Sequence, residues 1–136
     1  MNKDIKFSSL LGVQREQNSE QMQLPFADHV LNHVGNMHAS AQFALAEISS
    51  GDYMRKRFPE LADKVMAVVR RAEIKYSKPV DCLLTACPSA DDGEAKKMLD
   101  QLERKGKALF SVQVKLKNET GEITTHAVYH WFVTKL

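Results

Sequence analysis

Asn32-His-Val-Gly-Asn-Met-His-Ala-Ser-Ala-Gln-Phe-Ala-Leu-Ala-Glu47 is the most informative stretch of this chain. It begins with polar residues and a glycine, and from Ala39 to Ile48 apolar side chains then occupy every side of a helical wheel. A helix that is apolar all round is a buried helix. The same helix carries Glu47, and a carboxylate is costly to bury unless it is paired, protonated or functional. Glu47 is therefore the first candidate for a functional residue.

The composition is that of an ordinary globular protein. The chain has 136 residues, of which 43% are hydrophobic and 26% charged, and its formal net charge is +2. These values predict a single domain over residues 1–136, large enough for one core without disulfides or metals. Lys and Arg are scattered, which argues against a nucleic-acid partner. The modest basic excess suits an anionic small ligand.

The N-terminal stretch lacks the features of a targeting segment. It has no long apolar region and no cleavage site, and no window approaches 18 apolar residues. We therefore expect no signal peptide, no transmembrane helix and no membrane partner. Cys82 and Cys87 are predicted on opposite faces of one strand and its exit, so a disulfide between them is not expected. Reduced cysteines are typical of a cytoplasmic protein.

Hydrophobic periodicity and turn residues predict the order of the elements. Residues 1–20 form an arm or short helix, 22–28 are extended, and the apolar helix runs from His38 to Ser50 and ends at Gly51, before a polar connection over 52–61. Four strands are then predicted, at 64–76, 80–87, 109–116 and 123–133, with a helix at 95–105 closed by Gly106. A change of phase near Arg70 and Arg71 predicts a bulge in the first of these strands. An antiparallel sheet needs a cover on one face. The prediction is an α+β protein whose curled antiparallel sheet wraps around a central apolar helix.

This order of elements and the stretch quoted above resemble the hotdog-fold acyl-CoA thioesterases, in particular the phenylacetyl-CoA thioesterase-like branch and its uncharacterised relatives. The motif of that family is Asn, two residues, Gly, two residues, His-Gly-Gly, and an acid nine residues after the His. Asn32, Gly35, His38 and Glu47 stand at those spacings. The resemblance also covers residues 73–80, 106–116 and 121–133. The chain departs from the motif at two places. Ala39 and Ser40 replace the two glycines that follow the His, and the acid is a Glu.

The resemblance implies hydrolysis of an acyl-CoA or, as a less favoured substrate, an acyl-carrier-protein thioester. The start of a buried helix offers free N–H groups, and the N–H of Ala39 would stabilise the negative charge developing on the thioester oxygen. Glu47 lies about 12 Å further along the helix axis, too far for one carbonyl to contact both groups in one subunit. The resemblance therefore implies a homodimer, or a dimer of dimers, in which Glu47 meets the Ala39 end of the partner chain. Glu47 acts either as a general base on water or as a nucleophile.

Other motif residues are given supporting roles by the resemblance. Asn32 would hold a water molecule or the loop, and His38 would orient the carbonyl or cap the helix. Ser40 narrows the substrate space more than Gly would. Substrate binding is expected at Gly35, Ser40, Tyr76 and Lys78, with Lys78 near the coenzyme A phosphates. Coenzyme A is part of the substrate, and no further cofactor is expected.

Two other functions remain open. A hotdog domain that binds or senses acyl-CoA without hydrolysing it is the main alternative, and a hydratase or dehydratase of the same fold is a weaker one. A metal site is not expected, because His33 and His38 have no acidic partner at ligand spacing. We expect His126 and His130 on one strand face at the surface or a dimer contact, and Trp131 in the core or an interface.

Overall fold

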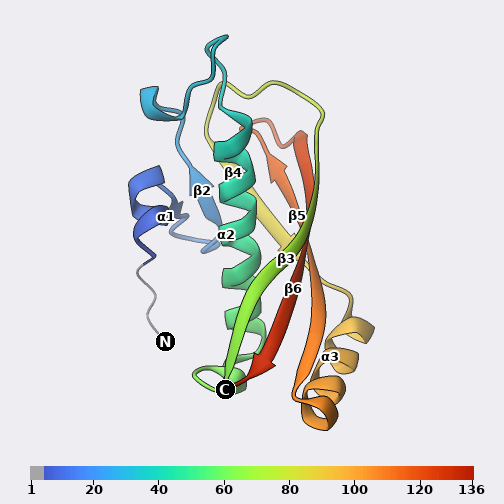
Figure 1. Cartoon of the computed structure of the whole chain (residues 1–136). Coiled ribbons are helices and arrows are strands. Elements are labelled where there is room, and N and C mark those ends of the chain that lie inside the picture. The colour runs from blue at the N-terminus through green and yellow to red at the C-terminus, as the bar shows by residue number, and fades with distance from the viewer. Residues whose placement is uncertain (1–4) are drawn as a thin grey trace.

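Six strands form one antiparallel sheet in the order β1-β2-β4-β5-β6-β3. The computed structural model describes residues 5–136. Its elements are, in chain order, α1 (Lys6–Leu11), β1 (Gln14–Arg15), β2 (Met22–Leu24), the 3₁₀ helix η1 (Asp28–Val30), α2 (Ala39–Arg57), the 3₁₀ helix η2 (Pro59–Leu61), β3 (Val65–Tyr76), β4 (Leu84–Ser89), α3 (Asp92–Lys105), β5 (Lys107–Lys117) and β6 (Ile123–Lys135). The sheet curls around α2, which runs along its inner face (Figure 1). The predicted fold class is confirmed.

The central helix is longer than the sequence pattern predicted. It does not end at Gly51 but continues to Arg57, where Pro59 prevents a further turn. Gly51 is instead a site of close approach, because a Cβ there would lie 3.3 Å from Cη2 of the Trp131 indole. The predicted polar connection over 52–61 is therefore wrong in its first half, which is the last part of α2.

The core lies between α2 and the inner face of the sheet. In β5 the predicted inward residues Phe110, Val112, Val114 and Leu116 are all buried. Tyr129 of β6 is also fully buried, and its hydroxyl donates a hydrogen bond of 2.7 Å to the carbonyl of Phe43 in α2. Alternation of apolar residues in the strands thus places one continuous apolar face against the helix.

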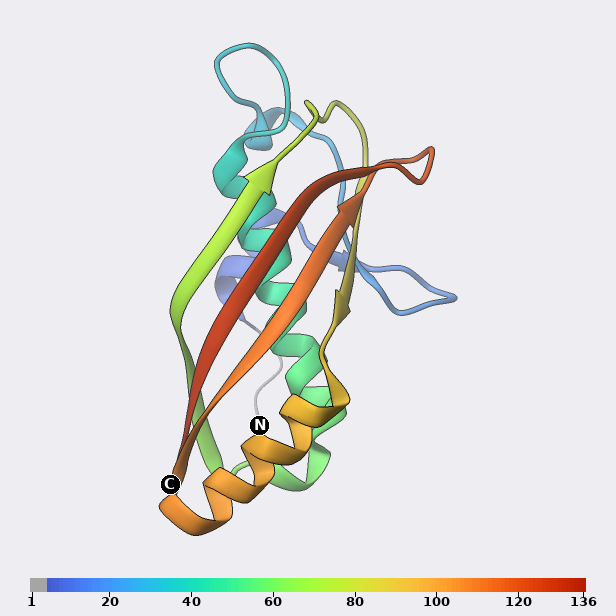
Figure 2. The same ribbon diagram turned by 90° about the vertical axis from the view of Figure 1, so that its right-hand side faces the viewer.

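The long strand β3 forms one edge of the sheet. It pairs with β6 along its whole length, and the register shifts between Val69 and Arg71, where the bulge was predicted. Figure 2 shows β3, β6 and β5 crossing in front of α2. No strand within residues 5–136 pairs with the other side of β3. Twelve residues of backbone are therefore available to a partner strand, as expected for an edge strand.

The segment before β4 departs from the prediction. The strand begins at Leu84 and not at Val80, so Cys82 lies outside it. Val80 is buried, and its carbonyl accepts a hydrogen bond of 2.7 Å from the N–H of Met37, in the loop that leads into α2. Cys82 and Cys87 are both free thiols. The argument from their strand faces was wrong, because only Cys87 lies in the strand.

The third helix, α3, follows the sequence prediction closely. The Asp91 side chain caps its first turn by accepting a hydrogen bond of 2.7 Å from the Gly93 N–H. Gly106 ends it with a φ of 76°, in the left-handed region that favours glycine. Its inward residues Met98 and Leu102 are buried, whereas Leu99 is half-buried.

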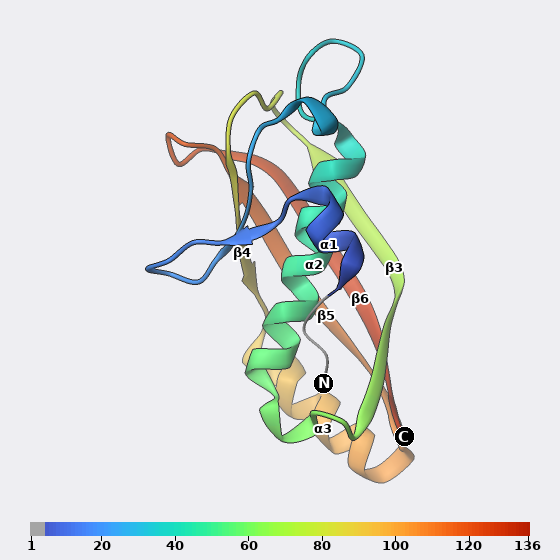
Figure 3. The same ribbon diagram turned by 90° about the vertical axis from the view of Figure 1, so that its left-hand side faces the viewer.

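The N-terminal arm packs against the outer side of α2. Figure 3 shows α1 in front of α2, on the side away from the sheet. Arg15 anchors the arm through two hydrogen bonds to Asp52 of α2, of 2.6 and 3.0 Å. The predicted arm or short helix is confirmed at α1, and its first four residues lie outside the described part. Among the helices of residues 5–136, none is both long and apolar enough to cross a membrane.

Candidate active site

Glu47 lies near the middle of α2, between this helix and the β3 side of the sheet. Its neighbours Ala46 and Ile48 are buried, and its own side chain is half-buried. Within residues 5–136 its carboxylate makes no hydrogen bond or ion pair. Burial raises the pKa of Glu47 above its ordinary value. A desolvated, unpaired carboxylate with a raised pKa is a stronger base than an ordinary carboxylate.

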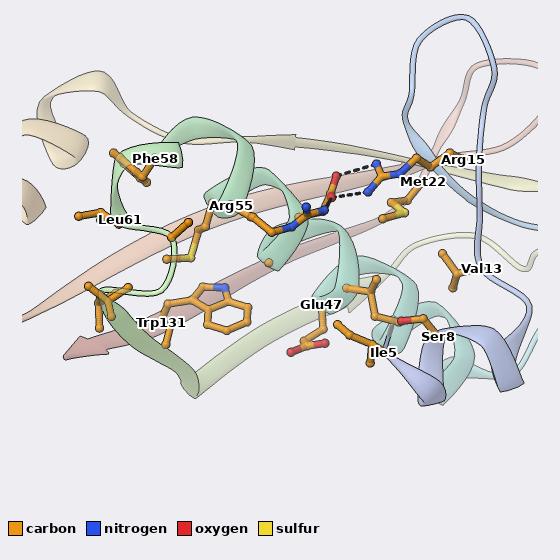
Figure 4. A pocket seen from close by; sticks show the side chains of 18 of the residues that line it. Ile5, Ser8, Val13, Arg15, Met22, Glu47, Arg55, Phe58, Leu61 and Trp131 are labelled. Carbon is orange, nitrogen blue, oxygen red and sulfur yellow. Dashed lines mark hydrogen bonds and ion pairs between the residues drawn. The ribbon is translucent and has the colours of Figure 1, made fainter. Parts of the chain in front are cut away.

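The carboxylate of Glu47 faces a cavity of about 440 Å³, a size typical of small-molecule sites. Figure 4 shows Glu47 among the side chains that line this cavity, with Ile5 and Ser8 of the arm on one side and Trp131 on the other. We call this space the Glu47 cavity. The hydroxyl of Ser8 is the one buried side-chain polar atom in the described chain that has no hydrogen-bond partner.

An ion-pair cluster lines the Glu47 cavity where the arm meets α2. Asp52 has a side chain only 10% exposed and contacts Arg15, Arg55 and Lys56. Burial alone would raise the pKa of Asp52, but the hydrogen bond and charge of Arg15, the charge of Lys56 and the hydrogen bond of Arg55 lower it below the ordinary value. Asp52 is therefore held in ion pairs, whereas Glu47 has none among the described residues.

A second cavity, of about 360 Å³, lies at the start of α2. We call it the Ala39 cavity, and it brings together four of the residues that the sequence assigned to the site. Its lining consists of Asn32, Val34, Asn36, Ala39, Gln42, Tyr76, Ser77, Lys78 and Pro79. Asn32 and the segment 76–79 are distant in sequence, so only the fold places them side by side.

Ala39 presents a free backbone donor at this cavity. It is the first residue of α2, and its N–H makes no hydrogen bond to any described residue. Its carbonyl accepts a hydrogen bond of 3.0 Å from the Tyr76 hydroxyl. Burial raises the pKa of Tyr76, which keeps this hydroxyl protonated as a donor. Tyr76 thus anchors the end of β3 to the first turn of α2.

The other motif residues shape the loop before α2. The side-chain oxygen of Asn32 accepts hydrogen bonds from the N–H groups of Val34 and Asn36, at 2.9 and 3.0 Å. Gly35 has a φ of 84°, which the left-handed turn requires. His38 caps the helix, because its Nδ1 accepts a hydrogen bond of 3.0 Å from the Ser40 N–H. In this structure these side chains hold the loop and the helix start.

Lys78 is paired in this structure. Its Nζ lies 2.5 Å from Oε2 of Glu122, in the turn before β6, and both side chains are about half exposed. The hydrogen bond and charge of Lys78 lower the pKa of Glu122. A phosphate that bound Lys78 would have to compete with this carboxylate.

Glu47 and Ala39 open into different cavities of one chain. They are eight residues apart on α2, which corresponds to about 12 Å along the helix axis. Neither cavity contains both residues. The structure thus brings Asn32, Ala39, Tyr76 and Lys78 together but leaves Glu47 apart from them within one chain.

Sequence reasoning missed Gln42. This residue is buried, with an exposed fraction of 4%. Its Nε2 donates a hydrogen bond of 3.1 Å to the Met37 carbonyl, and its Oε1 accepts one of 2.7 Å from the Thr125 hydroxyl. It lines the Ala39 cavity and fixes the first turn of α2 to β6. A lone amide on an otherwise apolar part of the helix was the available signal, because a buried amide has to be hydrogen-bonded.

Residues 5–136 contain no group of three or more His, Cys, Asp or Glu side chains placed to hold a metal ion. His126 and His130 lie on the outer face of β6, as predicted. His130 contacts Ser111 Oγ at 2.7 Å and Glu73 Oε1 at 3.1 Å, which occupies both of its ring nitrogens.

The model of a family described as a domain of unknown function, DUF4442, matches residues 12–133. The chain belongs to the DUF4442 family. The match covers nearly all of the sheet and both long helices. No curated protein matches the chain.

Solved structures confirm the hotdog fold. A protein of unknown function from Pseudomonas aeruginosa, described as a probable thioesterase, is 21% identical with a TM-score of 0.84, over 98% of this chain and 90% of that one. A Bacillus halodurans protein crystallised with CoA is 20% identical with a TM-score of 0.72, over 96% of this chain and 76% of that one. A thioesterase from Haemophilus influenzae is 17% identical with a TM-score of 0.75, over 96% and 83%.

Proposed function

We propose that this DUF4442 protein hydrolyses acyl-CoA thioesters as a homodimer, with Glu47 of one protomer acting beside the Ala39 N–H of its partner. The observation that carries the proposal is Glu47 itself, a half-buried carboxylate without a partner in the described chain that opens into a largely apolar cavity. Such a group is costly to keep unless its reactivity is used. Similar structures are described as thioesterases, and one of them was crystallised with CoA.

The chemistry follows from the two groups. Glu47 takes a proton from a water molecule whose oxygen attacks the thioester carbonyl carbon, and the partner's Ala39 N–H stabilises the negative charge on the carbonyl oxygen. Collapse of this intermediate breaks the C–S bond and releases the CoA thiolate and the carboxylic acid. In the alternative route Glu47 attacks directly and forms an anhydride that water then hydrolyses. Both routes need the carboxylate and the N–H at one carbonyl.

The free edge of β3 supports the dimer. A second copy that paired antiparallel with this edge would satisfy its backbone groups and place two α2 helices side by side in opposite directions. The Glu47 region of one helix would then face the Ala39 end of the other. This arrangement removes the separation of about 12 Å that prevents a single chain from building the site.

The first test is release of free thiol from a panel of acyl-CoAs, measured with a chromogenic thiol reagent. We expect Glu47→Gln to lower turnover by roughly two to four orders of magnitude, the usual share of a positioned base. Glu94→Gln, which changes an exposed carboxylate in the first turn of α3, is the matched control and should retain wild-type turnover. Wild-type turnover in Glu47→Gln would remove Glu47 from the mechanism.

A subunit mixing experiment tests the shared site directly. Ala39→Pro removes only the N–H in question, and proline is well tolerated at the first position of a helix. The preceding residue, His38, already has the extended ψ of 138° that a following proline requires. We expect each variant alone to be inactive. An equimolar mixture of Glu47→Gln and Ala39→Pro chains, unfolded and refolded together, should recover about a quarter of the wild-type activity, because half of the dimers contain one intact site. No recovery, in a mixture shown to form heterodimers, contradicts a site made by two chains.

A non-catalytic acyl-CoA-binding domain is the second candidate function. It is favoured by the separation of Glu47 from the Ala39 cavity, because a chain that stayed monomeric would lack a complete site. Saturable acyl-CoA binding without release of thiol from any member of the panel supports this alternative.

A further inference from the structure

The Glu47 cavity changes character along its length. The end that holds Glu47 has the charged side chains of Arg15 and Asp52 in its lining, together with apolar side chains such as Ile5 and Val13 of the arm. Its other end, around η2, is lined by apolar side chains, among them Phe58, Leu61 and Val133. Figure 4 shows Phe58 and Leu61 on the far side of Trp131 from Glu47. A ligand that fits such a space has a polar head and an apolar tail.

Trp131 lines the cavity between these two ends, and its position is fixed. Its Nε1 donates a hydrogen bond of 3.0 Å to Ser50 Oγ, and the Ser50 hydroxyl donates one of 2.7 Å to the backbone carbonyl of Glu47. The indole also packs directly on Gly51, where a Cβ would lie 3.3 Å from the ring. A chain that starts at Glu47 and enters the apolar end therefore passes a rigid aromatic wall.

The dimensions limit what can fill this space. From Glu47 to Phe58, α2 advances by about 16 Å, at 1.5 Å for each residue. An extended chain covers about 1.2 Å for each covalent bond, as in a polypeptide, which gives roughly 13 bonds over this distance. The volume of about 440 Å³ holds roughly 15 groups of the size of a water molecule, at about 30 Å³ each. The length and the volume of the cavity therefore indicate chains of about the same size.

We propose that this cavity binds the acyl chain of the substrate, that it fits an unbranched aliphatic chain of roughly ten to fourteen carbons, and that Trp131 and Gly51 are the residues that limit what can pass. The proposal rests on the proposed function in one respect, because the thioester is placed at Glu47. It adds the class of acyl group and the residues that select it.

The first test uses binding without hydrolysis, in the wild-type protein. The probes are S-alkyl coenzyme A thioethers with 2 to 18 carbons, which cannot be hydrolysed as thioesters. Trp131 is the only tryptophan, so its fluorescence reports on the cavity wall. We expect affinity to rise by up to about fourfold for each added methylene and to level off near 12 carbons. The emission should change with the 12-carbon thioether and stay unchanged with coenzyme A alone. Equal affinity for 2 and 12 carbons, or a bound 12-carbon thioether that leaves the emission unchanged, overturns the proposal.

The second test narrows the cavity. In Gly51→Ala the added methyl group meets the Trp131 indole. Either the ring is displaced into the cavity or the methyl group itself occupies part of it, and in both cases the cavity becomes narrower beside Trp131. We expect the 12-carbon thioether to lose at least tenfold in affinity while the 4-carbon thioether loses less than twofold. Phe132→Leu is the matched control, because Phe132 is the next residue of β6 and points to the opposite face of the sheet. An equal loss for both chain lengths contradicts the role of Gly51 and Trp131.

The two proposals fail separately. Chain-length-dependent binding without release of thiol from any acyl-CoA keeps the acyl cavity and rejects the thioesterase. Release of thiol that depends on Glu47 but not on chain length, with unchanged emission of Trp131, keeps the thioesterase and rejects the acyl cavity.

Discussion

Replacing Gln42 by Leu tests whether a buried amide holds the start of α2 in place. Gln42 is 4% exposed and joins the Met37 carbonyl to the hydroxyl of Thr125, which is fully buried. Leu has a similar volume but leaves the Met37 carbonyl without this partner, whereas the Thr125 hydroxyl keeps its contact of 3.2 Å with the Thr124 hydroxyl. An unsatisfied buried group costs about 1–3 kcal/mol, and the gain from the more apolar side chain offsets part of this cost. We expect a net loss of about 2 kcal/mol in the free energy of unfolding.

Urea denaturation followed by circular dichroism measures this loss, and a double-mutant cycle shows its origin. Thr125→Val removes the other partner of this hydrogen bond. The double variant should therefore lose less free energy of unfolding than the two single variants together, by about 1 kcal/mol or more. Gln113→Leu is the matched control, because the side chain of this exposed glutamine on β5 is hydrogen-bonded to His126 at the surface. It should change the free energy of unfolding by less than about 0.5 kcal/mol. A Gln42→Leu variant as stable as the control, or fully additive single changes, would refute the reasoning.

Two further predictions concern charge on α2. Because burial raises the pKa of Glu47, the folded state favours its neutral form. Well below pH 4.5, its ordinary pKa, Glu47→Gln and wild type should be equally stable. As the pH rises through 4.5 the wild type should lose stability relative to the variant, so chemical denaturation at pH 7 should find the variant more stable. Asp52→Asn should lower the free energy of unfolding by about 1–3 kcal/mol at pH 7, and this effect should disappear below its ordinary pKa of 3.8. Asp92→Asn changes a carboxylate that is 87% exposed and should lower the free energy of unfolding much less. Equal losses in Asp52→Asn and Asp92→Asn would contradict the claim that burial makes the Asp52 ion pairs stabilising.

Several features of this fold follow from short stretches of sequence. The alternation of Phe110, Val112 and Val114 defines the buried face of β5, and the cap at Asp91 with Gly106 defines the ends of α3. The phase change near Arg71 located the bulge in β3. These features depend on backbone geometry and side-chain periodicity within one segment, which is why the sequence alone is sufficient to predict them.

The end of α2 shows where local reasoning fails. Glycine after an apolar run is a common helix terminator, and Gly51 fitted that rule. In the folded chain Gly51 stays helical, and its missing side chain makes room for the Trp131 indole, 80 residues later in the sequence. A close approach between distant segments leaves no periodic signal in either of them.

The candidate site divides in the same way. The sequence by itself identified Glu47, because an acid in an apolar helix is conspicuous, and it placed Ala39 about 12 Å away from helix geometry alone. Only the tertiary structure brought Asn32, Tyr76 and Lys78 to one cavity, paired Lys78 with Glu122, and left Glu47 facing Trp131 in another. Helix and strand spacings are properties of one segment, whereas cavities and charge pairs depend on which distant segments pack together.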